Sequence, residues 1–333
     1  MTKASTTLAP TGGRTRGGLA WFSRYGALAA FGGLLALNIA VTPYFLSLQT
    51  LNINLTQVCT IIIVAVGMNL VIATGGIDLS VGSLMAISGV LAPMIFLGQV
   101  ILIGNTALAV ALAIVAAIGV AGLLGLFNGW LVSRFGIQPI VATLILFIAG
   151  RGIAQVLVDG NLQTFSVPQF AWIGQGALLG IPTQAFVMAA IVAAALWAMR
   201  RTRFGRYVLA VGGNERAASM SALPVRRIKL AVYAISGLCA GVAGLVVIAI
   251  NSASDSNQIG LGTELDAIAA VAVGGSSLGG GQARLLGTVL GALTIQLIRY
   301  TLLANGVPDA AALVVKAGVI ALAVWLQQAQ RRT

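Results

Sequence analysis

One carboxylate stands between two long apolar runs. Asp78 lies in the stretch VIATGGIDLSVGSLMAISG, residues 71–89, of a 333-residue chain that has only 7 acidic residues and no histidine. A carboxylate in such a place can hold an ion or a substrate, or it can cap a helix, because Asp is a favoured N-cap residue. Its position after Gly75–Gly76 and before an apolar run favours the cap, at a hinge between two helices.

Other charged residues lie within or near the apolar runs, namely Arg151, Glu264, Asp266, Arg299 and Lys316. A charge at the centre of a bilayer costs about 2.5–3.5 kcal/mol on insertion scales, so it should face the interior of a helix bundle or a water-filled cavity. Arg151 is the deepest of these residues, about midway along its run. Asp78, Arg151, Glu264 and Asp266 are therefore candidate pathway or gating residues.

Nothing in the sequence predicts a catalytic site. The glycine-rich string GGSSLGGGQAR, residues 274–284, lacks the GK[ST] ending of a phosphate-binding loop. Without histidine the chain also lacks the commonest metal ligand and proton shuttle, and we predict no metal site. The sequence thus indicates that a solute is moved rather than converted, with energy from ion coupling or from a separate subunit.

The composition predicts an integral membrane protein. Hydrophobic residues make up 59% of the chain and charged residues 8%, whereas about 25% of a soluble domain is charged. The apolar runs are continuous rather than alternating, which is typical of transmembrane helices and not of a barrel. Cys59 and Cys239 lie within these runs and are expected to be buried thiols.

We predict an all-α, polytopic membrane fold with about ten transmembrane helices. The predicted spans are 25–42, 55–73, 79–98, 101–124, 138–158, 182–199, 229–250, 264–279, 285–304 and 310–327. A bilayer core needs about 20 apolar residues per helix, so the short, glycine-rich span 264–279 could instead be a broken or re-entrant helix. The domain division is an N-terminal tail (1–24), a transmembrane domain (25–328) that includes a polar loop (200–228), and a C-terminal tail (329–333).

The net charge of +12 is unevenly distributed. Basic residues gather before the first span, in residues 200–229 and at the C-terminus, whereas most acidic residues lie in other gaps or at their edges. The positive-inside rule then places both tails and the loop 200–228 in the cytoplasm, and an even number of spans agrees with this. Because the charge is explained by topology, we expect no nucleic acid as a partner.

Two polar intervals have open interpretations. The loop 200–228 contains a short helical segment around residues 214–223, which Pro224 should end. This loop is either a docking element for a cytosolic partner or a solvated basic loop attracted to anionic lipid. On the opposite side, residues 161–182 form either a surface for a soluble partner or an amphipathic stretch at the membrane interface.

The sequence also contains a weak internal similarity. Residues 74–91 align with residues 273–290 at a constant offset of 199, and both segments open with a Gly-Gly pair. Glycine-interrupted segments at matching places in two halves point to the transport site of repeat-built transporters. The alternative to an internal repeat is chance matching among 42 glycines.

Several strings together resemble one family. They are VIATGGIDLSVGSLMAISG, FNGWLVSRFGIQPIVATL, Gly150–Arg151–Gly152, FGRYVLAVGGNERAA and ELDAIAAVAVGGSSLGGG, in order from about residue 55 to residue 328. The chain resembles the permease subunit of bacterial ABC importers for monosaccharides, the ribose, xylose, arabinose and galactose group, and is especially similar to the galactofuranose importer permease. The resemblance implies an inner-membrane transport subunit that is not an enzyme.

The resemblance also implies partners and a coupling site. The expected partners are a cytosolic ABC ATPase, a periplasmic sugar-binding protein and a second permease chain, identical or related. The chain itself is expected to bind no cofactor, because ATP and Mg²⁺ are used by the ATPase. The residues that match the coupling region are Gly205, Arg206, Gly212, Gly213, Asn214, Glu215, Arg216, Ala217 and Ala218. One departure follows them: Ser221–Ala222–Leu223 stands where the family pattern has a Ser-Gly-Ile-like sequence.

A monosaccharide is uncharged and rich in hydroxyl groups, so its path needs polar side chains more than ions. The candidate lining residues are Asn69, Asn128, Thr143, Gln155 and Gln296, although polar residues in spans also form hydrogen bonds between helices. An ion-coupled secondary carrier and a passive channel are the alternative functions.

Overall fold

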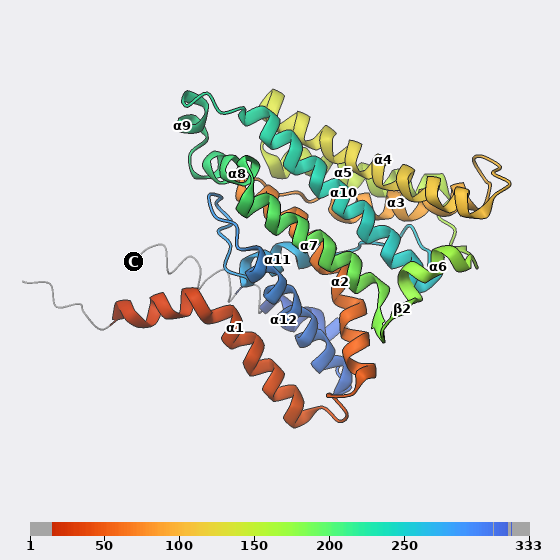
Figure 1. Cartoon of the computed structure of the whole chain (residues 1–333), viewed down its shortest axis with the longest axis horizontal. Coiled ribbons are helices and arrows are strands. Elements are labelled where there is room, and N and C mark those ends of the chain that lie inside the picture. Colours follow the sequence, from red (N-terminus) through yellow and green to blue (C-terminus); the bar gives the residue numbers. More distant parts are fainter. Residues whose placement is uncertain (1–14, 309, 319–320, 322–333) are drawn as a thin grey trace, which may run out of the picture.

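The computed structural model describes residues 15–308, 310–318 and 321, and these form a helical bundle (Figure 1). The predicted C-terminal tail, residues 1–14 of the predicted N-terminal tail and residues 322–328 of the transmembrane domain lie outside this part. The first helix begins at Thr15, ten residues before the first predicted span.

The described residues form twelve labelled helices and two small pairs of strands. The helices are α1 (Thr15–Val41), α2 (Leu48–Ala73), α3 (Val81–Phe96), α4 (Thr106–Phe135), α5 (Pro139–Leu157), α6 (Pro168–Gln175), α7 (Thr183–Arg201), α8 (Arg203–Gly213), α9 (Glu215–Met220), α10 (Val225–Asn251), α11 (Thr263–Val273) and α12 (Leu285–Ala304). Strand β1 (Gln163–Thr164) pairs antiparallel with β4 (Ala253–Ser254), and β2 (Ala177–Leu178) pairs with β3 (Ile181–Pro182). Residues 310–318 are helical as well.

The helical membrane class predicted from composition is confirmed. Within the described residues, α2, α4, α5, α7, α10 and α12 are long and apolar enough to cross a membrane, and shorter apolar helices cover residues 28–41 and 81–96. The predicted span 101–124 is displaced, because α4 begins at Thr106 and continues to Phe135.

The predicted span 264–279 is interrupted. Helix α11 ends at Val273, and at 1.5 Å per residue its 11 residues cover about 16 Å, about half of a bilayer core. The broken-helix alternative is therefore the one that the structure adopts.

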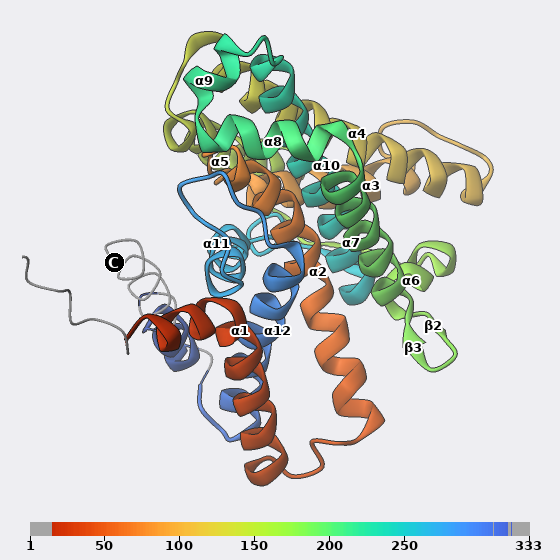
Figure 2. The ribbon, with the colours of Figure 1, turned by 60° about the vertical axis from the view of Figure 1, so that its left-hand side comes forward.

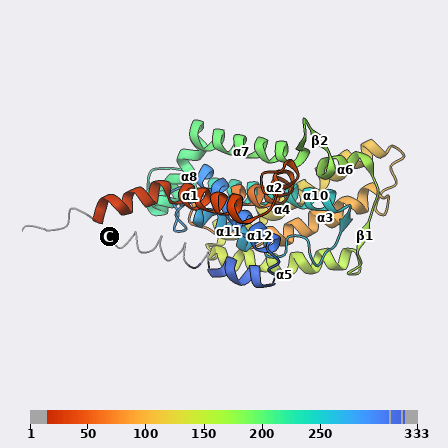
Figure 3. The same ribbon diagram turned by 90° about the horizontal axis from the view of Figure 1, so that it is seen from below.

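Helices α2 and α10 form the centre of the bundle. In the most apolar 18-residue stretch of each helix, 72% of α2 and 67% of α10 is buried inside the protein, against 22% for α7 and 28% for α5. In Figure 3, α7 and α5 lie along opposite sides of the bundle. Their apolar side chains face outward, as expected for helices surrounded by lipid.

Small residues bring α10 against α4. A Cβ on Gly237 of α10 would overlap the carbonyl oxygen of Ala121 and lie 3.0 Å from the Cα of Gly125. In a membrane, where lipid is as apolar as a leucine side chain, such close backbone packing is a main source of helix association.

The two ends of the bundle carry different elements. Helix α7 runs from the β2–β3 hairpin at one end to α8 and α9 at the other (Figure 2). The predicted polar intervals 161–182 and 200–228 therefore lie at opposite ends of this helix.

Candidate coupling site and buried polar clusters

Helices α2 and α11 end in the same way. In α2, the amides of Gly75 and Gly76 donate to the carbonyls of Ile72 and Val71, and Gly75 has a φ of 84°. In α11, the amides of Gly275 and Ser276 donate to the carbonyls of Ala272 and Val271, and Gly275 has a φ of 78°. Both ends are Schellman motifs, in which a left-handed residue after the helix satisfies the last carbonyls.

The equivalent left-handed glycines, Gly75 and Gly275, are 200 residues apart. The offset of 199 read from the sequence is therefore wrong by one residue at these two helix ends. The aligned glycine pairs, Gly75–Gly76 and Gly274–Gly275, begin at different positions of the motif.

The two interrupted segments are in contact. The amide of Gly281, in the segment that follows α11, donates to the carbonyl of Ala73, the last residue of α2, at 3.0 Å. A Cβ on Gly280 would lie 2.9 Å from the nitrogen of Gly75. We name residues 74–80 the first interruption and residues 274–284 the second interruption.

Asp78 organises the first interruption. Its carboxylate is fully buried and accepts hydrogen bonds from the Ser80 hydroxyl at 2.6 Å, the Ser80 amide at 3.1 Å and the Ser236 hydroxyl of α10 at 2.8 Å. Asn128 of α4 in turn donates to the Ser80 hydroxyl at 2.8 Å. The prediction that Asp78 is the N-cap of this helix is wrong, because the N-cap of α3 is Ser80. Asp78, two residues earlier in the chain, accepts hydrogen bonds from Ser80 instead.

Asn69 connects the second interruption to α2. Its side-chain nitrogen donates to the Ser276 hydroxyl at 3.0 Å and to the Thr288 hydroxyl of α12. The Ser276 hydroxyl also accepts from the Arg284 amide at 2.9 Å. A buried polar side chain is thus bonded within each interruption, as buried polar groups require.

Arg151 and Glu264 lie beside Gly82, near the start of α3. Arg151 of α5 donates to the carbonyls of Ser256 at 2.9 Å and Ile259 at 2.6 Å, both in the segment between α10 and α11. Glu264, in the first turn of α11, is 5% exposed. A Cβ on Gly82 of α3 would approach the Glu264 carboxylate. Arg151 is thus partly buried and bonded to backbone, and its place in the bundle interior or a water-filled cavity stays a prediction.

The remaining candidate residues are dispersed. Thr143 accepts from the amide of Leu79 at 3.1 Å, and Asp266 pairs with Lys316 at 2.6 Å. Two glutamines bond to other amide side chains, Gln155 to Asn257 at 2.8 Å and Gln296 to Gln57. The structure thus groups Asp78, Asn128 and Thr143 around the first interruption and separates them from Gln155 and Gln296. Among the described residues there is no cluster of metal-ligating side chains.

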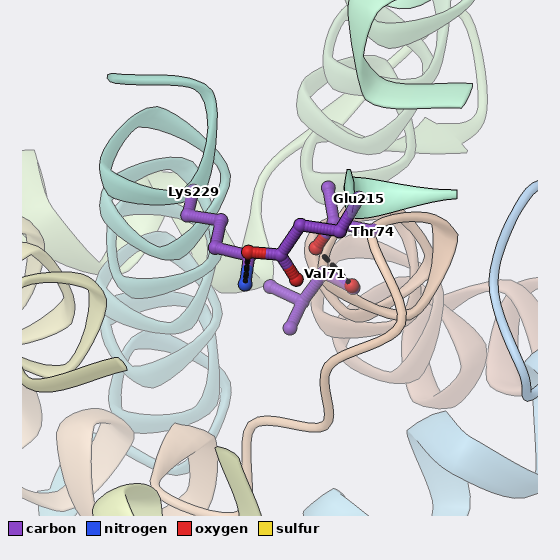
Figure 4. Close-up of polar contacts among 4 residues, drawn as sticks. All are labelled: Val71, Thr74, Glu215 and Lys229. Carbon is purple, nitrogen blue, oxygen red and sulfur yellow. Dashed lines mark hydrogen bonds and ion pairs between the residues drawn. The ribbon is translucent and has the colours of Figure 1, made fainter. Parts of the chain in front are cut away.

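Helices α8 and α9 contain the predicted coupling residues. Helix α9 begins with Asn214 as N-cap, whose side chain accepts from the Ala217 amide at 3.0 Å. Glu215 pairs with Lys229 of α10 at 2.7 Å, and at the end of α2 the Thr74 hydroxyl donates to the Val71 carbonyl at 2.8 Å (Figure 4). Residues Arg206, Gly213, Asn214, Glu215, Arg216 and Ala217 are exposed, whereas Gly205 and Ala218 are buried.

Two details of this loop differ from the sequence prediction. Helix α9 ends at Met220, so the helical segment is shorter than 214–223, and Pro224 precedes α10 instead of ending α9. Helix α8 was not predicted. Its buried residues Val208 and Val211 are three positions apart, a helical spacing that could have indicated it.

Ala222 is the residue at which we expected a glycine from the family that the sequence resembles. It adopts a φ of 57°, a left-handed conformation that costs an alanine roughly 1–2 kcal/mol. The bend after α9 is therefore kept without the glycine that would adopt it freely.

The helices, the two interruptions and the exposed basic end define a class of protein, the polytopic helical membrane proteins. Residues 49–324 match the model of one family, described as branched-chain amino acid transport system / permease component, and the chain belongs to this family. The resemblance seen in the sequence is thus confirmed at the level of the family.

Curated relatives match over most of their length. The galactofuranose transporter permease protein YtfT of Escherichia coli is 43% identical over 278 residues, 83% of this chain and 79% of the relative. The ribose import permease protein RbsC of Escherichia coli is 39% identical over 309 residues, 92% and 94% of the two chains. The L-arabinose ABC transporter permease protein AraH of Azospirillum brasilense is 34% identical over 322 residues, 96% and 91%. No solved structure matches the chain significantly.

Asp78 should act through hydrogen bonds rather than through its charge. We expect Asp78→Asn to keep most of the transport activity, because an amide can still accept from Ser80 and bond to Ser236. Asp78→Leu should lose activity and stability, since each buried donor left unpaired costs about 1–3 kcal/mol. Solute uptake and thermal stability in detergent would be measured for both variants. An equal loss of uptake in both variants, with stability retained, would show that the charge itself is required.

Proposed function

We propose that this chain is the transmembrane permease subunit of an ATP-driven ABC importer that carries a monosaccharide, a pentose or a hexose such as galactofuranose, across the bacterial inner membrane. The observation that supports this most strongly is the similarity to sugar-import permeases over 83–96% of the chain. The family match over residues 49–324 covers both interruptions and the coupling segment.

The proposed orientation places α8 and α9 in the cytoplasm, where the ATPase docks on residues 205–218. About ten membrane crossings, cytoplasmic tails and a possible internal repeat remain part of this proposal. The exposed arginines of the loop, among them Arg203, Arg206 and Arg216, support this orientation, because cytoplasmic loops carry the excess of basic residues. The β2–β3 hairpin and α6 then face the periplasm, where the sugar-binding protein docks.

The mechanism needs no chemical step in this chain. ATP binding by the ATPase moves the coupling segment, and the helices change between two packings that open to opposite sides. A second permease chain, identical or related, completes the pathway. ATP and Mg²⁺ remain with the ATPase.

The proposed sugar path is lined by neutral polar groups. Within the described residues, the side-chain oxygens of Asn69, Asn128 and Gln296 are buried and accept no hydrogen bond. A sugar hydroxyl is a donor that such oxygens can accept. Thr143 and Gln155 are further lining candidates, and Asp78, Arg151, Glu264 and Asp266 are proposed to position or gate the helices.

The function is tested by uptake in proteoliposomes. The chain is reconstituted with its ATPase and its sugar-binding protein, and the uptake of radiolabelled ribose, arabinose and galactose is measured with and without ATP. We expect uptake of one sugar that requires ATP, the ATPase and the binding protein together. Uptake by the chain alone, driven by an ion gradient, would instead show that it is a secondary carrier. Equilibration of the sugar across the membrane without ATP or an ion gradient would show that it is a channel.

The orientation is tested by cysteine labelling. Cys59 and Cys239 are buried, so a single introduced cysteine gives the signal. Leu179, at the hairpin tip, is 98% exposed, and Met220, in α9, is 82% exposed. A membrane-impermeant maleimide added to spheroplasts should label Leu179→Cys and leave Met220→Cys unlabelled, and inverted vesicles should give the opposite pattern. Labelling of Met220→Cys in intact spheroplasts would refute the cytoplasmic docking site.

A further inference from the structure

The end of helix α8 is in backbone contact with both interruptions. A Cβ on Gly212 would overlap the carbonyl oxygen of Ala73 and lie 2.6 Å from the nitrogen of Gly281. A Cβ on Gly280 would lie 2.8 Å from the carbonyl oxygen of Gly212 and 2.9 Å from the nitrogen of Gly75. Three segments that are far apart in the sequence thus meet through their main chains.

The contact is rigid because it is made of backbone atoms. A side chain between two segments can change rotamer and absorb a small displacement, whereas glycines in van der Waals contact cannot. The hydrogen bond from the Gly281 amide to the Ala73 carbonyl joins the two interruptions at the same point. Packed elements of this kind move as units rather than deform continuously.

Each interruption is also bonded to a different central helix. Asp78 of the first interruption accepts from Ser236 of α10, and Ser276 of the second accepts from Asn69 of α2. A displacement of α8 therefore reaches α2 and α10, the two most buried spanning helices, through two short chains of contacts.

We propose that Gly212 is a positioning residue that passes the movement of the coupling segment to both interruptions at once. This inference rests on the proposed function, since it requires that an ATPase moves α8. The glycine is required because any side chain there would separate α8 from the end of α2. Gly212 lies within the segment 205–218 on which the ATPase is proposed to dock, but it packs against Ala73 and Gly281, whereas its neighbour Gly213 is exposed.

The test compares Gly212→Ala with Gly119→Ala in the complete transporter. Both changes add one methyl group to a helical glycine, but a Cβ on Gly119 meets no atom within 4 Å. We expect Gly212→Ala to assemble with its partners and to hydrolyse ATP, while sugar uptake falls about tenfold, a usual size for coupling between distant sites. The ATP consumed per sugar should rise accordingly, which a purely structural defect would not produce. Gly119→Ala should match the unaltered chain in both measurements.

A second measurement covers the case in which Gly212→Ala does not assemble. Spin labels are placed on Ala210→Cys in α8 and Gln282→Cys in the second interruption, both exposed positions. The proposal predicts that their separation stays constant when ATP binds, because the two segments move together.

The outcomes separate this proposal from the one on which it rests. Unimpaired uptake at the unaltered ATP consumption in Gly212→Ala, or a change in the spin-label separation on ATP binding, would overturn the role of Gly212. Absence of ATP-driven uptake in the unaltered transporter would instead overturn the proposed function.

Discussion

A helix that stops inside a packed bundle leaves backbone amides and carbonyls without intrahelical partners, and buried groups of this kind must be paired within the protein. The part of the chain that the structure describes has two such helix ends, which lead into residues 74–80 and residues 274–284. The Schellman motifs at Gly75 and Gly275 satisfy the last carbonyls of each helix. The Ala73 carbonyl is then paired by Gly281 of the other interruption. The second interruption thus helps to satisfy the end of the helix that leads into the first.

This pairing determines which side chains surround the interruptions. Asp78 supplies acceptors for the donors of Ser80 and Ser236, and Asn69 supplies donors for the hydroxyls of Ser276 and Thr288. A carboxylate is rare in this chain, but at position 78 it can accept three hydrogen bonds. Asp78 is thus part of the packing around the hinge between α2 and α3.

Much of the fold could be predicted from the sequence, because long apolar runs separated by polar intervals specify spanning helices. A polar partner for Arg151 could be expected for the same reason, since a charge in the middle of an apolar run has to avoid lipid, and its guanidinium does donate to two backbone carbonyls. The break at Gly274–Gly275 was indicated by the shortness of its apolar run. These features could be predicted because each depends only on residues that are close together in the sequence.

Contacts between distant residues could not be predicted in the same way. The sequence suggested that Asp78 caps a helix, but the cap is Ser80, and Ser80 is bound by Asn128 from 48 residues away. From the sequence, Gly212 and Gly213 were both predicted to be coupling residues, with nothing to separate them. In the structure, only a Cβ on Gly212 would overlap the carbonyl oxygen of Ala73. Which of two neighbouring glycines is needed depends on what packs against them, and that is a property of the fold.

Hydrogen exchange followed by mass spectrometry on the assembled transporter tests the pairing of the interruptions most directly. If the second interruption is bonded to the end of α2, the hydrogen-bonded amides of Gly75, Gly76, Ser276 and Gly281 should exchange slowly and open together, at one common rate. Rapid exchange of the second interruption while the first stays protected would show that the two are independent, and would contradict the account.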